Sequence, residues 1–148
     1  MSRQFLMVLF GFLVLMGCAG NIPKLGVNSG QLMPCPNTPN CVSSQTTDKS
    51  HFIQPMHFSG AREEAQQRML QILNTLQQTE IKTVQENYIR AEFTSKIFRF
   101  TDDVEFYFMP IKNDMITINL RSASRIGYSD LGANRKRIEL IRKLFIQD

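Results

Sequence analysis

Residues 104–121 read VEFYFMPIKNDMITINLR, and the fold can be worked out from this stretch. Apolar and polar side chains alternate on both sides of its centre, as expected for two antiparallel strands with one apolar face. Side chains of the same face must pair across a hairpin. The pairs that satisfy this condition are Phe106 with Leu120 and Phe108 with Ile118. They leave a three-residue loop, Lys112-Asn113-Asp114, whereas a two-residue Asn113-Asp114 loop would set apolar against polar residues and is rejected.

The same logic extends the sheet toward the N-terminus. It pairs Phe98 with Phe106, and Phe100 with Val104, around a turn at Thr101-Asp102-Asp103. On the opposite face, Arg99, Glu105 and Arg121 then stand in one row, with the carboxylate between two guanidinium groups. Each such cross-strand pair stabilises a sheet by about 0.2–1 kcal/mol. The pairing of the strand around Ile89 stays open, because no loop length suits every apolar residue.

Helical periodicity flanks these strands on both sides. A helix is predicted from about Gly60 to Gln78, with Ser59 as its cap and an apolar stripe at helical spacing. A second helix is predicted to begin near Leu131, capped by Asp130, with a basic outer face. The segment 51–59 is short, apolar and interrupted by Pro55, which suits an edge strand. The predicted fold class is α+β: an antiparallel sheet of about four to five strands with two helices packed on one face.

Composition limits the possible classes of protein. The chain has 148 residues, of which 43% are hydrophobic and 20% charged, so one ordinary globular domain is expected rather than a disordered tail or a long coiled coil. The net charge of +4 is modest and Trp is absent, which argues against nucleic acid as a partner. The three cysteines are an odd number and need separate explanations.

The first cysteine follows a segment typical of export. Arg3 precedes the apolar run FLMVLFGFLVLM at residues 5–16, which is long enough for a signal peptide and too short for a membrane span. The run ends in Leu15-Met16-Gly17-Cys18, which resembles the bacterial lipobox. Residues 1–17 are therefore predicted to be a lipoprotein signal peptide and Cys18 the lipidated residue, with a plain secretory signal or an uncut anchor as alternatives. The residue after this cysteine is Ala19 rather than aspartate. This resembles the pattern of lipoproteins that Gram-negative bacteria send to the outer membrane by default.

The other two cysteines follow a polar stretch. Residues 18–33 are predicted to be the lipidated cysteine with a flexible tether, and residues 34–148 a single α+β domain. Cys35 and Cys41 are separated by five residues and would pair most simply as a disulfide in an oxidising compartment. A metal site formed with His51 and His57 is the alternative, although the spacing is loose for zinc. A catalytic thiol is disfavoured because the second cysteine would trap it.

Two motifs carry a family resemblance. The first is Pro-Asn-Cys-Val-Ser-Ser at residues 39–44, and the second is Ser-x-Ser-Arg-x-Gly-x-Ser-Asp-x-Gly-x-Asn-Arg at residues 122–135. Together with the Asp-Asp-Val-Glu-Phe stretch at residues 102–106, they resemble the bacterial and plastid family known as domain of unknown function 1499. The resemblance covers Cys35 to about Phe145. It implies a small envelope or secreted protein, often a lipoprotein, and brings no established reaction with it.

The densest polar stretch is the candidate site. Its residues are Asp102, Asp103, Glu105, Arg121, Ser124, Arg125, Asp130, Asn134 and Arg135. One interpretation is structural, with Arg125 holding Asp102 or Asp103 and Asp130 satisfying helix amides. A second is an anion site, because guanidinium groups match carboxylate and phosphate. A third is a hydrolase-like enzyme at the Asp102/Arg125 region, although the sequence has no suitable serine elbow, phosphate loop or metalloprotease motif.

These observations predict a lipid-anchored protein of the bacterial cell envelope, facing the periplasm at the outer membrane if the host is Gram-negative. Its role is expected to be binding or scaffolding rather than catalysis, and no cofactor or metal is expected. The expected partners are the membrane, through Cys18, and an anionic envelope ligand. The envelope enzyme is kept as the alternative.

Overall fold

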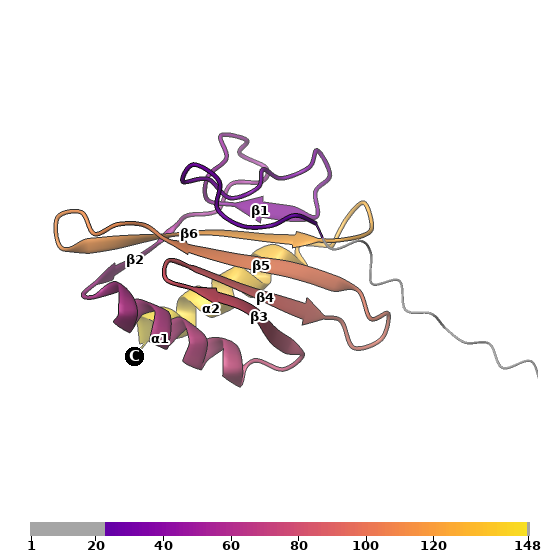
Figure 1. The fold of residues 1–148 in the computed structure, drawn as a ribbon. Coiled ribbons are helices and arrows are strands. Elements are labelled where there is room, and N and C mark those ends of the chain that lie inside the picture. The colour runs from indigo at the N-terminus through magenta and orange to yellow at the C-terminus, as the bar shows by residue number, and fades with distance from the viewer. Residues whose placement is uncertain (1–22, 148) are drawn as a thin grey trace, which may run out of the picture.

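The computed structural model describes residues 23–147, so the predicted signal peptide and Cys18 lie outside the described residues. The elements are β1 (Cys41–Ser43), β2 (Met56–Ser59), α1 (Arg62–Thr75), β3 (Thr79–Gln85), β4 (Tyr88–Thr94), β5 (Thr101–Phe108), β6 (Met115–Ser124) and α2 (Ala133–Gln147). The strands form one antiparallel sheet in the order β1-β6-β5-β4-β3, and β2 also pairs with β6 (Figure 1). The mixed α+β class is confirmed, but the described sheet has six strands rather than four to five.

The central hairpin has the predicted register in its body. Phe106 pairs with Leu120 and Phe108 with Ile118, as the alternation requires. The prediction of a three-residue loop is wrong at the tip, where Lys112 pairs with Met115 around a two-residue turn. Asn113 and Asp114 adopt φ values of 52° and 59° there, a conformation that these residue types tolerate. An extra residue on the β5 side, next to Pro110, shifts the register and keeps the apolar residues on one face.

The predicted strand around Phe98 does not exist. Residues 95–100 form an exposed loop, and residues 101–103 belong to β5 instead of a turn. The reason is the pairing of β4 with β5, in which Ala91 meets Val104 and Ile89 meets Phe106, so that the aliphatic and phenylalanine side chains of both strands share one face. As a consequence Arg90, not Arg99, stands beside Glu105 in the row that also holds Arg121.

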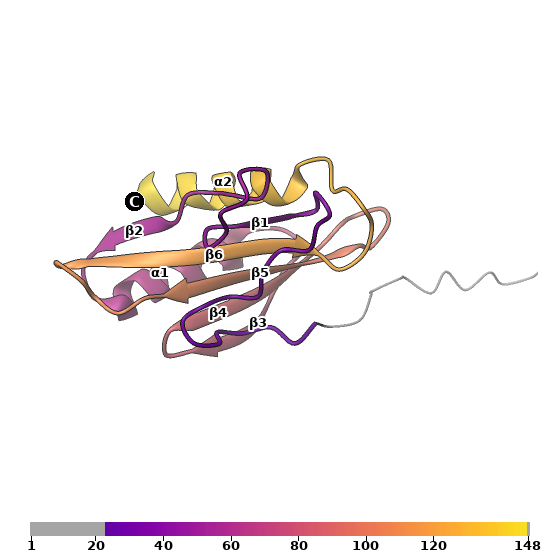
Figure 2. The same cartoon turned by 90° about the horizontal axis from the view of Figure 1, so that it is seen from above.

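Both helices contribute to one hydrophobic core beneath the sheet. This core joins Met69 and Leu73 of α1 and Ile138 and Ile141 of α2 to the even-numbered apolar residues of β5. Figures 1 and 2 show both helices on the same side of the sheet. Neither helix within residues 23–147 is long and apolar enough to span a bilayer.

The first helix is shorter than predicted at both ends. Ser59 ends β2 and does not cap the helix, which begins at Arg62 after an extended Ala61. Gly60 occupies the bend between them with a φ of 145°, and a Cβ there would lie 2.7 Å from the ring of Phe58. The chain leaves the helix before β3 begins at Thr79, a strand that the helical pattern concealed.

The opposite face of the sheet is covered by the N-terminal segment, defined here as residues 23–34. Leu32 packs against Tyr88 and Tyr107 of the sheet, and its backbone N–H donates to Gln45 Oε1 over 2.8 Å. Figures 1 and 2 show this segment running along the face that the helices leave free. The described part of the expected tether therefore packs on the sheet, and the folded region begins before Pro34.

The predicted disulfide is present. Cys35 and Cys41 are bonded, with their Cα atoms 5.7 Å apart, so the bond fastens the end of the N-terminal segment to β1. Serine at both positions is expected to lower the free energy of unfolding by about 2 kcal/mol, from loop-closure entropy. Urea unfolding with and without reductant measures this difference in the free energy of unfolding. Wild-type protein should lose this stability on reduction, and the double variant should not respond; equal stability of the oxidised wild type and the variant would contradict the expectation.

Candidate functional site

The sheet divides the predicted site residues between its two faces. In β5 the side chains of Asp103 and Glu105 point to the face covered by the N-terminal segment, while Asp102 points to the helix side. The same alternation in β6 puts Arg121 with Glu105 and puts Ser124 with Asn134. Asp102 and Asp103 therefore cannot act as a pair of carboxylates on one substrate.

Glu105 is the most deeply buried charged residue of the site, with an exposed fraction of 0%. Its Oε1 accepts hydrogen bonds from the Tyr88 hydroxyl at 2.7 Å and from the backbone N–H of Gly26 at 3.2 Å. Its Oε2 accepts one from Arg121 Nη1 at 3.2 Å. The N-terminal segment thus supplies the third hydrogen bond to a carboxylate at the centre of the sheet.

Burial dominates the titration of this group. It raises the pKa of Glu105 above its ordinary value, against the lowering effects of Tyr88, Arg121 and Gly26. Burial also raises the pKa of the Tyr88 phenol, and the neighbouring Glu105 carboxylate adds to this effect. The Tyr88 phenol therefore stays protonated and donates its hydrogen bond to the buried carboxyl group of Glu105.

The raised pKa of Glu105 predicts a sign for the pH dependence of stability. A raised carboxyl pKa contributes stability that is present below the unfolded pKa and is lost as the pH rises through the folded pKa. Between about pH 4 and pH 7, wild-type protein should therefore lose stability relative to Glu105→Gln, which cannot ionise. Urea midpoints at the two pH values measure this, with Glu86→Gln, which removes an exposed carboxylate, as the matched control. Parallel profiles for wild type and Glu105→Gln would contradict it.

Arg125 is committed to two carboxylates beside Glu105. Its Nε and Nη2 donate to the two oxygens of Asp103 at 2.7 and 2.9 Å, and Nη2 also donates to Glu92. These bonds raise the pKa of the guanidinium, Asp103 contributing most. Asp103 is only 1% exposed, so its ion pair with Arg125 is buried. The bonds to Asp103 and Glu92 join the end of β6 to β5 and β4, and they leave Arg125 little capacity to bind a ligand.

Asn134 organises the network on the helix side. It is fully buried, its Nδ2 donates to Ser124 Oγ and to the Asn40 carbonyl, both at 3.0 Å, and its Oδ1 accepts from Ser122 Oγ at 2.5 Å. Arg137 donates to the same Oδ1 and to Asp102 Oδ2, each at 2.6 Å. The two sequence motifs, far apart in the chain, therefore meet through side chains and backbone at the start of α2.

The remaining two site residues have structural partners. Asp130 accepts from the backbone N–H groups of Asn134, at 2.7 Å, and Gly132, at 3.0 Å, which satisfies amides at the start of α2. Arg135 donates to the carbonyl oxygens of Phe52 and Ser50 and so ties α2 to the loop before β2. Neither side chain is directed at a shared site with Arg121.

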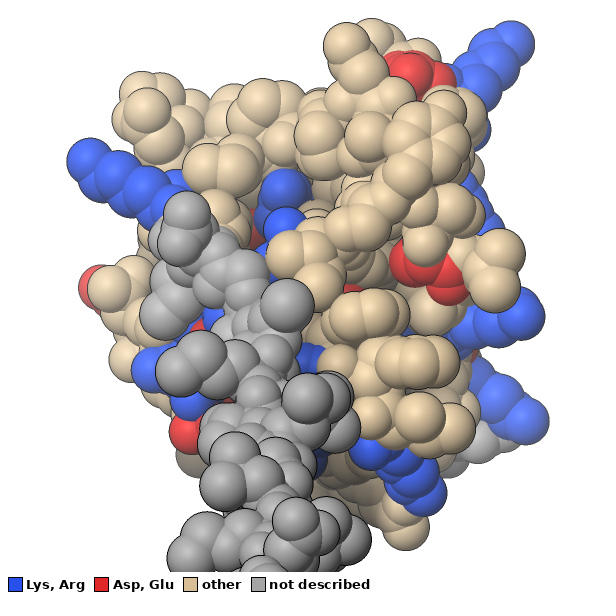
Figure 3. Space-filling view, turned by 90° about the vertical axis from the view of Figure 1, so that its right-hand side faces the viewer, with Lys and Arg blue, Asp and Glu red and all other residues tan. Residues whose placement is uncertain are grey.

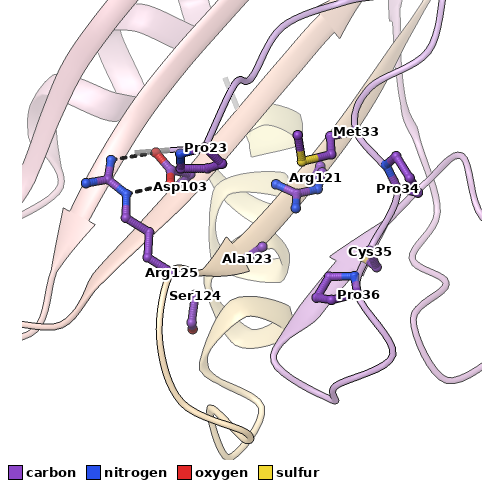
Figure 4. A pocket seen from close by; sticks show the side chains of 10 residues that line it. All are labelled: Pro23, Met33, Pro34, Cys35, Pro36, Asp103, Arg121, Ala123, Ser124 and Arg125. Carbon is purple, nitrogen blue, oxygen red and sulfur yellow. Dashed lines mark hydrogen bonds and ion pairs between the residues drawn. The ribbon is translucent and has the colours of Figure 1, made fainter. Parts of the chain in front are cut away.

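Arg121 is the exception among the predicted arginines. It is 4% exposed, its Nη1 donates a hydrogen bond to Glu105, and its buried Nε has no hydrogen-bond partner. It lines a cavity of about 410 Å³, whose other lining residues are Pro23, Met33, Pro34, Cys35, Pro36, Asp103, Ala123, Ser124 and Arg125. Figure 4 places its guanidinium beneath Met33, between Asp103 and Pro34. Within residues 23–147, Arg62, Arg68 and Arg90 also have a buried Nε without a partner, but none of them lines this cavity.

A buried N–H without an acceptor costs about 1–3 kcal/mol. A ligand oxygen at the cavity wall would remove that cost, because a guanidinium donates strongly to carboxylate and phosphate. The rest of the wall is dominated by proline, methionine and the disulfide. The cavity thus combines one available cationic donor with largely apolar surroundings, which is the usual chemistry of a small-ligand site.

The metal alternative finds no arrangement to support it among residues 23–147. No group of three or more histidine, cysteine, aspartate and glutamate side chains lies together there as metal ligands would. Cys35 and Cys41 are bonded to each other, and His51 Nδ1 lies 2.8 Å from the Cys41 carbonyl oxygen. His57 lies on β2, with Nδ1 3.4 Å from Thr117 Oγ1.

Several residues of the site escaped the sequence analysis. Tyr88, Arg90 and Glu92 occupy alternate positions of β4 on the face of Glu105, so the alternation around Ile89 contained the signal. The alternation alone does not give the register of β4 with β5. Without that register, the sequence does not show that these side chains lie beside Glu105. Gly26 contributes only a backbone N–H, which no side-chain pattern reveals.

The family model for the protein of unknown function DUF1499 matches residues 31–145. The chain belongs to this family. The match begins within the N-terminal segment and runs through β6 to the last turns of α2, so it includes Glu105, Arg121 and the side chains of both hydrogen-bonded networks, but not Gly26. Comparison with curated proteins gives no match.

Proposed function

We propose that this chain is a lipid-anchored protein of the bacterial cell envelope that binds a ligand without catalysis. The ligand carries a carboxylate or phosphate oxygen, which accepts a hydrogen bond from Arg121 inside the cavity. The observation that carries the proposal is Arg121, a lining residue of the cavity whose buried Nε has no hydrogen-bond partner. The anchor is Cys18, supported by the lipobox-like Leu15-Met16-Gly17-Cys18.

The site suits binding better than hydrolysis. Asp102 and Asp103 point to opposite faces, so they do not form an acid and base pair. The described histidines, His51 and His57, do not line the cavity, which leaves its Ser124 without an imidazole base. Within residues 23–147, no observation therefore favours the alternative of an envelope hydrolase.

Nuclear magnetic resonance of the arginine Nε–H groups tests the proposal, on the full chain in detergent micelles. Acetate and inorganic phosphate serve as probes. The Arg121 signal, identified by its loss in Arg121→Gln, is expected to shift with at least one probe, with a dissociation constant of about 1 mM for so small a contact.

Ala123→Met is the matched variant, because it fills the cavity and leaves the Arg121–Glu105 pair in place. It should keep the Arg121 signal and lose the shift. An unmoved Arg121 signal with both probes, or an equal shift in Ala123→Met, would overturn the binding proposal.

A further inference from the structure

One end of the molecule carries an unusual share of exposed apolar side chains. Ten large apolar side chains are exposed within residues 23–147, and five of them belong to the loops at residues 95–100 and 125–132. These five, called here the apolar end, are Ile97, Phe98, Phe100, Tyr128 and Leu131, with exposed fractions from 43% to 89%. Exposed apolar side chains gathered in one place indicate an interaction surface.

The two loops are neighbours in space. The backbone N–H of Arg125, which opens the second loop, donates to the carbonyl of Thr101, directly after the first loop, over 3.1 Å. Figures 1 and 2 show both loops at the same end of the sheet. Figure 3 faces this end and shows mostly uncharged side chains, with lysines and arginines mainly at the margins and a few acidic side chains among them.

The charges of the loops suit an anionic surface. Residues 95–100 read SKIFRF, in which the exposed Lys96 and Arg99 are interleaved with apolar side chains, and the Phe98 and Phe100 rings stack with centroids 5.5 Å apart. The acid of the second loop, Asp130, is occupied by two amide N–H groups of α2. Aromatic and aliphatic groups between cations are typical of segments that lie in the headgroup region of a bilayer.

The position of Pro23, where the described chain starts, indicates that the apolar end lies next to the membrane. Pro23 shares a cavity wall with Ser124 and Arg125, so the N-terminal segment begins beside the second loop. Cys18 is five residues upstream of Pro23. Because an extended chain spans at most about 3.6 Å per residue, these five residues reach about 18 Å. A lipid on Cys18 would therefore hold this end of the domain, and not the opposite hairpin, next to the membrane.

We infer that the apolar end docks on the membrane surface, with Ile97, Phe98 and Leu131 in the headgroup region and Lys96 and Arg99 near anionic lipid phosphates. The domain is thereby oriented on the bilayer rather than suspended from a tether. This orientation rests on the proposed lipid anchor at Cys18.

The chain contains no tryptophan, so a single introduced tryptophan reports its own surroundings. Phe98→Trp is placed in the full chain, which is purified with its lipid and reconstituted into vesicles of phosphatidylglycerol and acyl-brominated phosphatidylcholine. Docking predicts a blue-shifted emission that the bromines reduce about twofold or more, relative to unbrominated vesicles. Leu131→Trp should respond in the same way from the second loop, which keeps the test informative if one variant does not fold.

Ile111→Trp is the matched control, since Ile111 is also exposed but lies at the hairpin between β5 and β6, at the other end of the sheet (Figure 1). Its emission should be insensitive to bromine. Co-flotation of protein with vesicles, combined with tryptophans at 98 and 131 that bromine does not quench, would overturn the docking while leaving the anchor intact. Quenching at 111 equal to that at 98 would overturn the orientation. Failure of the protein to float with vesicles would contradict the anchor itself.

Discussion

Replacing Arg125 with alanine is expected to lower the free energy of unfolding by about 3–5 kcal/mol, because it leaves a buried carboxylate without the cation that is hydrogen-bonded to it. Asp103 is 1% exposed and receives two hydrogen bonds from Arg125. Arg90 Nε lies 3.9 Å from Asp103 Oδ1, beyond hydrogen-bond distance, and cannot replace both bonds. Glu92 loses a donor as well.

A double-mutant cycle separates the lost pair from other effects of the substitution. Asp103→Asn removes the charge that Arg125 neutralises, so adding it to Arg125→Ala should recover part of the lost stability. The measurement is urea unfolding of the two single variants, the double variant and wild type. Strictly additive effects of the two substitutions, or a loss under about 1 kcal/mol for Arg125→Ala, would show that the pair contributes little.

Replacing Cys18 with serine is expected to move nearly all of the protein from the membrane fraction to the soluble fraction. Each buried acyl CH₂ contributes about 0.8 kcal/mol, so several chains on one cysteine hold a protein firmly, and their loss releases it. Membrane fractionation of cells expressing the full chain measures the effect. The intact mass of the processed N-terminus should show acyl groups on wild type and none on Cys18→Ser.

The other two cysteines provide the control for this change. A chain with serine at positions 35 and 41 loses the disulfide but keeps Cys18, and it should stay with the membrane. Unchanged membrane retention of Cys18→Ser would refute anchoring through that residue. Release of the 35/41 double variant would indicate that the folded domain, rather than the lipid, holds the protein.

Local patterns sufficed where side-chain alternation and packing agree. The body of the central hairpin followed from the rule that same-face residues pair, and Phe106 does lie opposite Leu120. The Cys35–Cys41 bond followed from the spacing of the two cysteines and the expectation of an oxidising compartment. In both cases the deciding interaction joins residues that are near each other in sequence, or strands joined by a short loop.

The rule failed where an exposed loop imitates a strand. Phe98 and Phe100 alternate with polar residues as a half-buried strand would, yet both are exposed. The β4–β5 register was needed to exclude them, and it depends on a six-residue loop that periodicity does not measure. The same error separated Arg90 from Glu105 in the predicted charge row.

The candidate site was located in sequence but not resolved into its parts. Clustering of polar residues in the chain could not show that the sheet sends Asp102 and Asp103 to opposite faces. Nor could it show that Arg125 and Arg135 are already bonded while Arg121 keeps a free Nε. Such distinctions depend on long-range contacts, including the N-terminal segment that covers Glu105.

The central claim is that the Arg121 cavity binds a ligand in the envelope. Native mass spectrometry of the lipidated full chain, extracted from its host membranes, tests it most directly. Wild type and Lys143→Gln, which removes an exposed cation away from the cavity, should carry the same bound mass. That mass should be absent from Arg121→Gln and from Ala123→Met. A wild-type chain without any adduct, or an adduct that persists in both cavity variants, would contradict the account.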